Sequence, residues 1–327
     1  MKIQLRHGAG GADTARLIGD IFAERLGNEV LNRMEDAAVL PCPAGELVMT
    51  TDSFVVQPLT FAGGDIGRLA VCGTVNDLLC MGARPLYLTA GFILEEGLDS
   101  ALLTRLVESM ARTAAEAGVH IVAGDTKVIE GNGGLYINTT GLGARPAERE
   151  VSAANLRPGD ALILSGTLGD HHATILSARM GLESELQSDC APLGGMVEAL
   201  FAAEAEVHAM RDVTRGGLAT VACELAEASG CAIELTEDAL PVSAGVRALT
   251  GILGLDVLTM GNEGKLLIAV PEGDALRALE IVQASPYGGQ AAVIGAVREG
   301  NGVTLHTAIG GRRVVAPLRG EGLPRIC

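Results

Sequence analysis

Hydrophobic residues recur with both helical and strand periods along the chain, which predicts a mixed α/β protein. Residues 13–26 place the apolar side chains Leu17, Ile18, Ile21, Phe22 and Leu26 on one helical face. Residues 100–117 predict a second amphipathic helix, with a stripe from Leu103 to Ala114. The segment 66–81 is apolar on nearly every side, which is typical of a helix that is buried all round.

Short apolar runs between turn-forming residues predict strands in both halves of the chain. In the first half we expect strands near residues 37–40, 46–51, 86–94, 119–123 and 135–143. In the second half we expect strands at 161–164, 266–270, 291–297, 303–308 and 313–315. Helices are predicted between these at 172–181, 192–204, 218–228, 242–253 and 275–284.

The segment 144–158 separates the two halves, because it is polar and rich in turn-forming residues. A chain of 327 residues is long enough for two domains. We therefore expect an N-terminal domain at 1–147, a C-terminal domain at 148–318 and a tail at 319–327.

The amino-acid composition disfavours nucleic acids and membranes as binding partners. A formal net charge of −16 would repel nucleic acids and anionic membranes, and an aromatic content of 2% disfavours a stacking platform for single-stranded nucleic acid. Residues 1–7 contain no apolar secretory core, and no apolar run approaches membrane-spanning length, so the cytoplasm is the expected compartment. Binding of a phosphate compound would need a local positive charge, such as a metal ion, to offset the negative charge of the protein.

The cysteines argue against two structural classes. The chain has 7 of them, an odd number, and none forms a CxxC pair. This pattern disfavours a disulfide framework and a zinc ribbon. We expect most of the six internal cysteines to be small buried residues.

Five aspartates lie where an apolar element ends or is interrupted, namely Asp36, Asp52, Asp77, Asp125 and Asp212. If the fold gathers them at one pole, a hard cation would be needed to offset their repulsion. Magnesium commonly bridges carboxylates to substrate phosphates, so the set indicates a nucleoside triphosphate held through metal. For any single aspartate, a turn or helix cap is the alternative. Asp77 stands in the apolar helix 66–81, so we expect a cationic partner for it.

Lys127 and Arg215 are the candidate counter-charges for phosphate, with surface ion pairs as the alternative. Gly216 and Gly217 precede a predicted helix, where an anion could approach the backbone closely. The chain has neither a Walker A pattern nor a strand-linked G-x-G-x-x-G, which disfavours P-loop and dinucleotide folds.

Three histidines and one glutamate are further candidates. His7, His171 and His172 could carry protons or bind ligands, but packing or surface roles are the alternative. His171 and His172 are adjacent on a predicted helix and point to different faces, which disfavours a joint zinc site. Glu263 lies between Asn262 and Gly264, where it is a general base or a turn residue.

The last residue, Cys327, follows Pro324 on a segment that could extend and withdraw. Such a thiol could travel between two sites. The alternative is a frayed terminus that ends in a cysteine without a function.

The order of these motifs closely resembles the HypE family of hydrogenase maturation factors along the whole chain. The motifs are Leu5–Gly11, Glu35–Ala38, Thr50–Phe54, Gly63–Gly67, Asn76–Asp77, Gly124–Lys127, Asp212–Leu218, Asn262–Gly264 and Pro324–Cys327. The central motifs are shared with aminoimidazole ribonucleotide synthetase and selenophosphate synthetase. The Pro-Arg-Ile-Cys terminus is what resembles HypE in particular. The chain departs at His172, where the resemblance leads us to expect glycine.

The resemblance implies an α+β, PurM-like fold of two domains. The N-terminal domains would pair into a shared β-barrel in a homodimer with ATP at the interface, and a C-terminal α/β sandwich domain would precede a flexible tail. It implies that the five aspartates bind the phosphates of Mg-ATP. Around them would lie Asn76, Gly124, Thr126, Lys127, Arg215, Gly216 and Gly217.

The resemblance also implies a reaction. Cys327 would receive a carbamoyl group from the carbamoyltransferase HypF, and ATP would drive its dehydration to a thiocyanate. The cyano group would then pass to iron on the HypC–HypD scaffold of the [NiFe] centre. Removing the amide protons requires a base, for which Glu263 is the first candidate and Lys127 and His7 are weaker ones. Gly320 and Gly322 would be hinges of the tail.

Two other functions remain alternatives at this point. A selenophosphate synthetase would have a reactive Cys or selenocysteine near the N-terminal glycines, but this chain has no cysteine before Cys42. A non-catalytic adaptor could use the tail only to dock on a partner. The aspartates, Lys127 and Arg215 weigh against an adaptor, which has no need of them.

Overall fold

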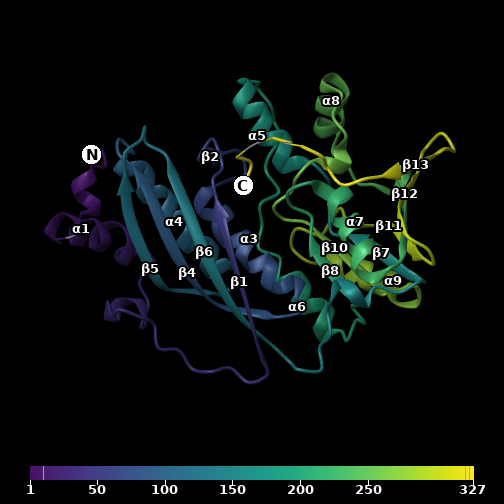
Figure 1. Ribbon diagram of the computed structural model, residues 1–327, viewed down its shortest axis with the longest axis horizontal. Helices are drawn as coiled ribbons and strands as arrows, with labels where there is room; N and C mark the ends of the chain where they lie inside the picture. Colours follow the sequence, from purple (N-terminus) through teal and green to yellow (C-terminus); the bar gives the residue numbers. More distant parts are fainter. Residues whose placement is uncertain (10, 321, 324) are drawn as a thin grey trace.

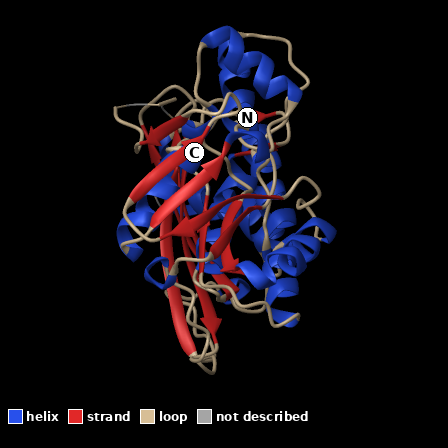
Figure 2. Ribbon diagram, turned by 90° about the vertical axis from the view of Figure 1, so that its right-hand side faces the viewer, coloured by secondary structure: helices blue, strands red, loops and turns tan. Residues whose placement is uncertain are grey.

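A computed structural model of the chain describes residues 1–9, 11–320, 322–323 and 325–327. Gly10 of the glycine-rich segment and Glu321 and Pro324 of the tail lie outside this description. Two β-sheets stand side by side, with the helix α3 (Ile66–Cys80) between them and the C-terminus near the centre (Figure 1). Figure 2, turned by 90°, shows helices and strands mixed throughout and both chain ends toward the same end of the molecule.

The first sheet has the strand order β1-β6-β4-β5. Its strands are β1 (Glu46–Phe54), β4 (Arg84–Glu95), β5 (His120–Ile129) and β6 (Leu135–Arg145). Strand β6 pairs antiparallel with β1 and β4, whereas β4 and β5 are parallel. The parallel pair needs a crossover, which the amphipathic helix α4 (Ser100–Glu116) provides. A small hairpin of β2 (Thr60–Phe61) and β3 (Gly64–Asp65) leads into α3.

Helices α3 and α4 cover only one face of this sheet. Thirteen of the 15 residues of α3 are buried, as its apolar composition predicts. On the opposite face Leu47 and Met49 of β1, Ile93 of β4 and Ile129 of β5 are 62%, 69%, 43% and 42% exposed. Within the described residues β1 and β5 are the sheet edges, and the sheet does not close into a barrel.

The second sheet has seven strands in the order β13-β12-β9-β11-β7-β10-β8. These are β7 (Asp160–Leu164), β8 (Ala209–Asp212), β9 (Ala232–Thr236), β10 (Leu266–Pro271), β11 (Ala292–Arg298), β12 (Gly302–His306) and β13 (Arg312–Val315). Strands β7 and β10 are buried on both faces, so they read as nearly continuous apolar runs. Alternate residues of β7 contribute to two separate cores, Ile163 to one and Leu162 and Leu164 to the other.

Helices pack on both faces of the second sheet. On one face lie α6 (Gly194–Ala202) and α9 (Ala275–Ala284), whose apolar residues share a core with Ile163. On the other face lies α7 (Gly217–Ser229), whose Val221 and Leu225 share a core with Leu162. The helices α5 (Asp170–Met180) and α8 (Ala244–Leu253) project beyond the sheet (Figure 1). None of the described helices is both long and apolar enough to cross a bilayer.

The main sequence-based predictions of helices are confirmed, with local differences. The helix predicted at 13–26 is divided into α1 (Gly11–Leu17), a π-helical turn η2 (Ile18–Ala23) and α2 (Glu24–Leu26). The strand predicted at 37–40 is wrong, since these residues have no regular structure. Strands β8 and β9 were not predicted, because they are only 4 and 5 residues long and carry charged side chains.

Candidate functional site

The structure separates the predicted site residues into two groups. We call the first group the tail site, which comprises Asp52, Asp77, Asp212, Arg215, Glu263 and Cys327. We call the second the β5 cluster, which comprises His7, Asp36, Gly124, Asp125, Thr126 and Lys127. The prediction that the five aspartates gather at one pole is therefore wrong for a single chain. Asp52 is on β1 and Asp125 on β5, at opposite edges of the sheet.

Strand alternation explains the separation further. Asp52 points to the covered face of the sheet, where a side chain on Gly73 of α3 would lie 3.6 Å from its Oδ2. Asp125 and Lys127 pair in register with Gly91 and Ile93, on the open face. Both aspartates were predicted at strand ends, but the strands continue to Phe54 and Ile129 and place them in strand interiors.

The carboxylates of the tail site destabilise one another's charged forms. Burial and the nearby Asp212 raise the pKa of Asp77 to about 7. Burial also raises the pKa of Asp52 and Asp212. In the described part of the chain no ion pair of Asp77 is found: its Oδ2 accepts a hydrogen bond from the Thr50 hydroxyl at 2.8 Å, and the charge of Arg211 lowers its pKa without direct contact. A cation from outside the chain would relieve this repulsion.

The described end of the tail is docked in this site. Cys327 is 8% exposed, and Arg215 donates a hydrogen bond from Nη2 to its Sγ at 2.8 Å. Burial and the neighbouring Glu263 raise the pKa of the Cys327 thiol to about 12. Since the thiolate is the reactive form, the docked thiol is a poor nucleophile at neutral pH.

Gly216 and Gly217 position Arg215 at the start of α7. Both have positive φ, of 83° and 64°. A Cβ on Gly217 would lie 2.5 Å from the Leu258 carbonyl oxygen and 2.6 Å from that of Met260. The glycine therefore permits close packing of α7 against residues 258–260, a role that explains it without a bound anion.

Glu263 lies on a loop that is fixed from several sides. Its side chain is 4% exposed, and its backbone N–H donates to Asp189 Oδ1 at 3.1 Å. The preceding Asn262 accepts from the Gly169 N–H at 2.7 Å and donates to the Val213 carbonyl at 2.9 Å. Burial, with Cys190 and Asp189 nearby, raises the pKa of Glu263 well above its usual range.

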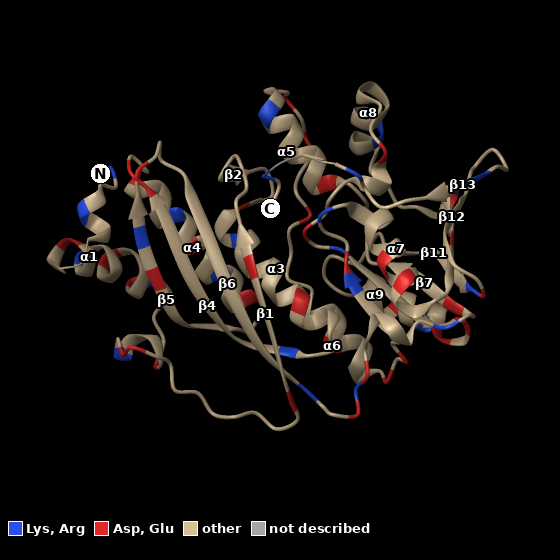
Figure 3. Cartoon of the chain, viewed as in Figure 1, with Lys and Arg blue, Asp and Glu red and all other residues tan. Residues whose placement is uncertain are grey.

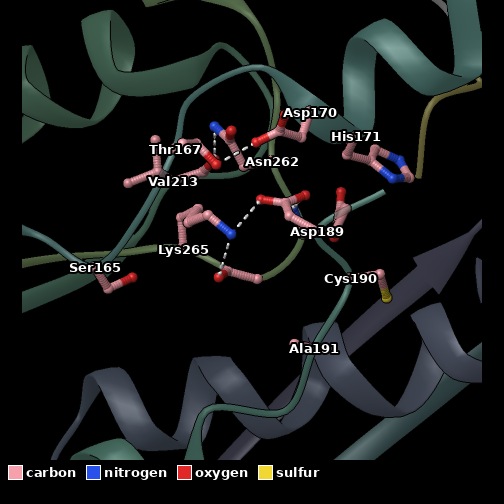
Figure 4. A network of polar contacts seen from close by, with 12 residues as sticks. Ser165, Thr167, Asp170, His171, Asp189, Cys190, Ala191, Val213, Asn262 and Lys265 are labelled. Atoms are coloured by element: carbon pink, nitrogen blue, oxygen red, sulfur yellow. Dashed lines mark hydrogen bonds and ion pairs between the residues drawn. The ribbon is translucent and has the colours of Figure 1, made fainter. Parts of the chain in front are cut away.

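A buried ion pair between Lys265 and Asp189 packs against the loop that carries Glu263. Lys265 Nζ lies 3.1 Å from Asp189 Oδ2, and both side chains are less than a tenth exposed. Lys265 also donates to the Gly264 carbonyl at 3.2 Å, and Figure 4 shows the two charged groups facing one another. This pair was not predicted, because 76 residues separate its members and neither lies in a distinctive motif.

The β5 cluster is more exposed. Lys127 Nζ lies 2.6 Å from Asp125 Oδ2, and this hydrogen bond lowers the pKa of Asp125. Beside β5 lies a cavity of about 200 Å³. It is lined by Asp36, Gly124, Asp125 and Thr126 and by apolar side chains that include Phe22 and Phe92. Within one chain, Lys127 on β5 therefore lies at the opposite edge of the sheet from β1, the strand that carries Asp52 of the tail site.

Two predicted residues have structural roles. Asn76 donates to the Ala191 carbonyl and accepts from the Leu193 N–H, both at 3.0 Å, so its amide ties α3 to the segment before α6. Its predicted place around ATP stays a prediction, to which the structure adds this packing role. His7 is buried beside β5, and its Nδ1 accepts the Gln4 N–H at 2.9 Å, so within one chain it is not at the tail site.

The described residues contain no set of three His, Cys, Asp or Glu side chains placed to hold one metal ion. Of the internal cysteines, those at 72, 80, 190 and 231 are buried, as predicted for most of them, whereas Cys223 is half-buried and Cys42 is exposed. Acidic and basic residues occur in both halves of the chain (Figure 3), so the negative charge is not confined to the tail site.

Comparison with known proteins identifies the family. Residues 34–144 match the AIR synthase related protein, N-terminal domain, and residues 157–308 match the C-terminal domain. Carbamoyl dehydratase HypE of Azotobacter vinelandii is 50% identical over 99% of this chain and 97% of its own length. HypE of Escherichia coli strain K12 is 48% identical over 99% of both chains.

Solved structures agree with these relatives. A crystal structure of the hydrogenase maturation protein HypE in complex with ATP has a TM-score of 0.95 and 46% identity and covers 99% of each chain. A HypE–HypF complex has a TM-score of 0.81 and 46% identity, covering 92% of this chain and 99% of that one. A thiamine-monophosphate kinase at 24% identity and a TM-score of 0.68 shares the fold. The two-domain, PurM-like α+β fold, the spacing of the motifs and the docked terminal cysteine together show that this chain belongs to the HypE family of carbamoyl dehydratases.

Proposed function

We propose that this chain is an ATP-dependent carbamoyl dehydratase that acts on its own C-terminal cysteine. The substrate is an S-carboxamide on Cys327, and the product is a thiocyanate that supplies the cyanide ligand of iron in [NiFe] hydrogenases. The docked tail is the observation that carries this proposal, since Cys327 lies buried against Arg215 and beside Glu263. The activity named for its relatives supports the same reaction.

The reaction balances without a further reagent. The amide oxygen attacks the terminal phosphorus of ATP, an O–P bond forms and ADP leaves. The C–O bond then breaks and the oxygen departs in inorganic phosphate, a far better leaving group than the free amide oxygen. The nitrogen loses two protons as the carbon–nitrogen triple bond forms, of which one ends on phosphate and the other is released.

Within the chain, Glu263 is the proposed base, because it is the buried carboxylate beside the docked sulfur. Arg215 would hold the sulfur and stabilise negative charge near it. In the docked state the thiol is protonated, which favours loading of Cys327 while the tail is undocked. The predicted hinge Gly320 has a φ of 81°, which is favourable only for glycine and fits a turn into the tail.

Asp52, Asp77 and Asp212 would contact a magnesium nucleotide, because hard carboxylate oxygens are its usual ligands, although the three are not placed to hold one metal ion by themselves. Burial, and after it the charge of Asp212, raises the pKa of Asp77, and a bound cation would offset both. When bound, Mg²⁺ would neutralise charge on the transferred phosphoryl group. The relative solved with ATP supports ATP as the nucleotide.

We further propose a homodimer in which the β5 cluster of one subunit completes the tail site of the other. The exposed apolar face, with Leu47, Met49, Ile93 and Ile129, supports pairing into a shared barrel. Asp36, Asp125, Lys127 and the backbone at Gly124 and Thr126 would then reach the nucleotide. His7 and Lys127 could assist the chemistry only from the partner subunit.

The same proposal assigns domains and partners. The N-terminal domain at 1–147 would bind ATP and dimerise, the C-terminal domain at 148–318 would hold the docked tail, and residues 319–327 would move. HypF would load the cysteine and HypC–HypD would unload it, in the cytoplasm. The HypE–HypF complex of a relative supports the first of these partners.

Intact mass and isotope labelling test the function. The purified protein is incubated with the carbamoyltransferase, carbamoyl phosphate carrying ¹⁸O in the carbonyl group, and Mg-ATP. We expect one carbamoyl group per chain, then loss of one water equivalent, with ¹⁸O recovered in phosphate. Cys327→Ala should gain no adduct. An adduct on Cys327→Ala, or label that remains on the protein after ATP is consumed, would disprove the mechanism.

A further inference from the structure

The carbonyl oxygens of all three C-terminal residues are held by the body of the protein. The Gln57 N–H donates to the Arg325 carbonyl at 3.0 Å, and the Val55 N–H donates to Cys327 at 3.1 Å. The two donors, and likewise the two acceptors, are two residues apart, and the two segments run in opposite directions. The tail is therefore paired with residues 55–57 as an added antiparallel strand would be. The carbonyl between the two acceptors, that of Ile326, accepts a hydrogen bond from His171 Nε2 at 2.7 Å.

His171 is held in one tautomer by its surroundings. A carbonyl oxygen only accepts, so Nε2 must carry the hydrogen and Nδ1 of the neutral ring must accept. Nδ1 lies 2.7 Å from the Ser188 hydroxyl, which can donate to it while accepting the Cys190 N–H at 3.1 Å. The ring is fully buried and stands edge-on to Phe61, with 5.3 Å between the ring centroids. Burial lowers the pKa of His171, which keeps the ring neutral.

The residue that His171 holds is also anchored by packing. Ile326 is 4% exposed, and a Cβ on Gly261 would lie 3.6 Å from its Cδ1. Gly261 is two residues before Glu263, so the anchor for the tail and the proposed base share one loop. Figure 4 shows His171 directed from α5 toward the C-terminal segment.

We propose that His171, oriented by Ser188, is a positioning residue that fixes the register of the tail so that the sulfur of Cys327 meets Arg215 and Glu263. This inference rests on the proposed function, because it assumes that the docked tail is the reacting one. The contact is to the backbone one residue before the cysteine. It therefore restrains a carbamoylated and an unmodified tail alike, and it orients the carboxamide without taking part in proton transfer.

Three variants test the role. His171→Leu removes the donor and fills the space, whereas His171→Gln keeps an N–H donor. His172→Leu is the matched control, since it removes the adjacent imidazole, whose Nδ1 accepts from the Gly261 N–H at 3.4 Å and which makes no described contact with the tail. The first readout is the alkylation rate of Cys327, measured by peptide mass spectrometry with the exposed Cys42 as internal reference. It needs neither ATP nor the transferase.

Because His171→Leu loses one neutral hydrogen bond to the tail, its Cys327 should be alkylated about tenfold faster than in wild type. Cys327 of His171→Gln should be alkylated at nearly the wild-type rate. Dehydration of preloaded protein in a single turnover should slow to a similar extent, while loading by the transferase should not slow. Equal protection in His171→Leu and wild type, or equal exposure in His172→Leu, would overturn the inference. If His171→Leu fails to fold, Ser188→Ala carries the test, and unchanged alkylation there would also overturn it.

The two proposals fail differently. If wild-type protein never converts its carboxamide with ATP, the proposed function fails, whatever the alkylation rates. If wild type forms thiocyanate and His171→Leu does so at the same rate with the same Cys327 protection, only the role of His171 fails.

Discussion

At the scale of single residues, burial sets the protonation states that the proposed chemistry depends on. Asp77 has a pKa near 7, Cys327 near 12, and Glu263 well above the usual carboxylate range. In each case desolvation is the largest cause, and neighbouring acidic groups add to it. Without nucleotide and metal, the tail site is therefore less negative than its sequence indicates.

Asp77→Asn should stabilise the unliganded protein. The pKa of Asp77 is higher in the folded protein, at about 7, than its ordinary value of 3.8. Between pH 3.8 and about 7 Asp77 is more protonated in the folded than in the unfolded protein. The contribution of Asp77 to the free energy of unfolding therefore falls as pH rises through this range. We expect a gain of about 1–3 kcal/mol at pH 8 that vanishes near pH 4, measured by urea unfolding with EDTA present. The exposed Asp238→Asn is the control, and an equal gain at both pH values would contradict the assignment.

Glu263→Gln should separate loading from dehydration. The amide keeps the shape of the side chain but cannot accept a proton. Carbamoylation of Cys327 should be unchanged, and thiocyanate formation should fall by about 100-fold or more. In wild type the dehydration rate should rise with pH above the ordinary carboxylate range, and this rise should be lost in the variant. Single-turnover mass spectrometry measures both, with the exposed Glu272→Gln as control.

At the scale of elements, helix α3 joins the two sheets through close contacts. A Cβ on Gly67 would lie 2.2 Å from the Leu106 carbonyl oxygen of α4, and Asn76 binds the backbone of residues 191 and 193. The apolar sequence of α3 predicts burial, but it does not reveal which neighbour requires a glycine.

Gly67→Ala should destabilise the protein by about 1–3 kcal/mol, because the backbone of α4 must move to admit the methyl group. Gly251→Ala in the exposed helix α8 is the matched control. No atom lies within 4 Å of its added Cβ, so it should be neutral or gain about 0.5–1 kcal/mol from helix propensity. Thermal and urea unfolding compare the two, and equal effects would refute close α3–α4 packing.

At the scale of the whole molecule, the tail site and the β5 cluster lie at opposite edges of one sheet. A single chain therefore carries two halves of the proposed ATP site that do not meet. Pairing of the open faces would bring unlike halves together, as expected for a symmetric dimer.

Subunit mixing tests this arrangement. Lys127→Ala and Cys327→Ala should each form no thiocyanate as homodimers. After unfolding and refolding together, half of the sites in each mixed dimer should contain both native residues, so about a quarter of wild-type thiocyanate should return. No recovery, despite mixed dimers detected by native mass spectrometry, would show that each site lies within one subunit.

The sequence predicts well what depends on local patterns. Alternation and helical periodicity locate most elements, and α3 is buried as its composition indicates. The tail motif singles out Cys327, and Glu263, between Asn262 and Gly264, lies beside it. Short strands such as β8 and β9 are missed, because a few residues with charged side chains carry little periodic signal.

Periodicity and motifs along the chain were enough to predict the family, most of the elements and the residue types available for chemistry, because these features are encoded locally. Which residues meet followed from the folded structure alone. It divided the five aspartates between the tail site and the β5 cluster, gave Asn76 a packing role and joined Asp189 to Lys265. It also brought His171 to the carbonyl of Ile326, 155 residues away. Such contacts depend on strand order, side-chain alternation and burial, which no local pattern encodes.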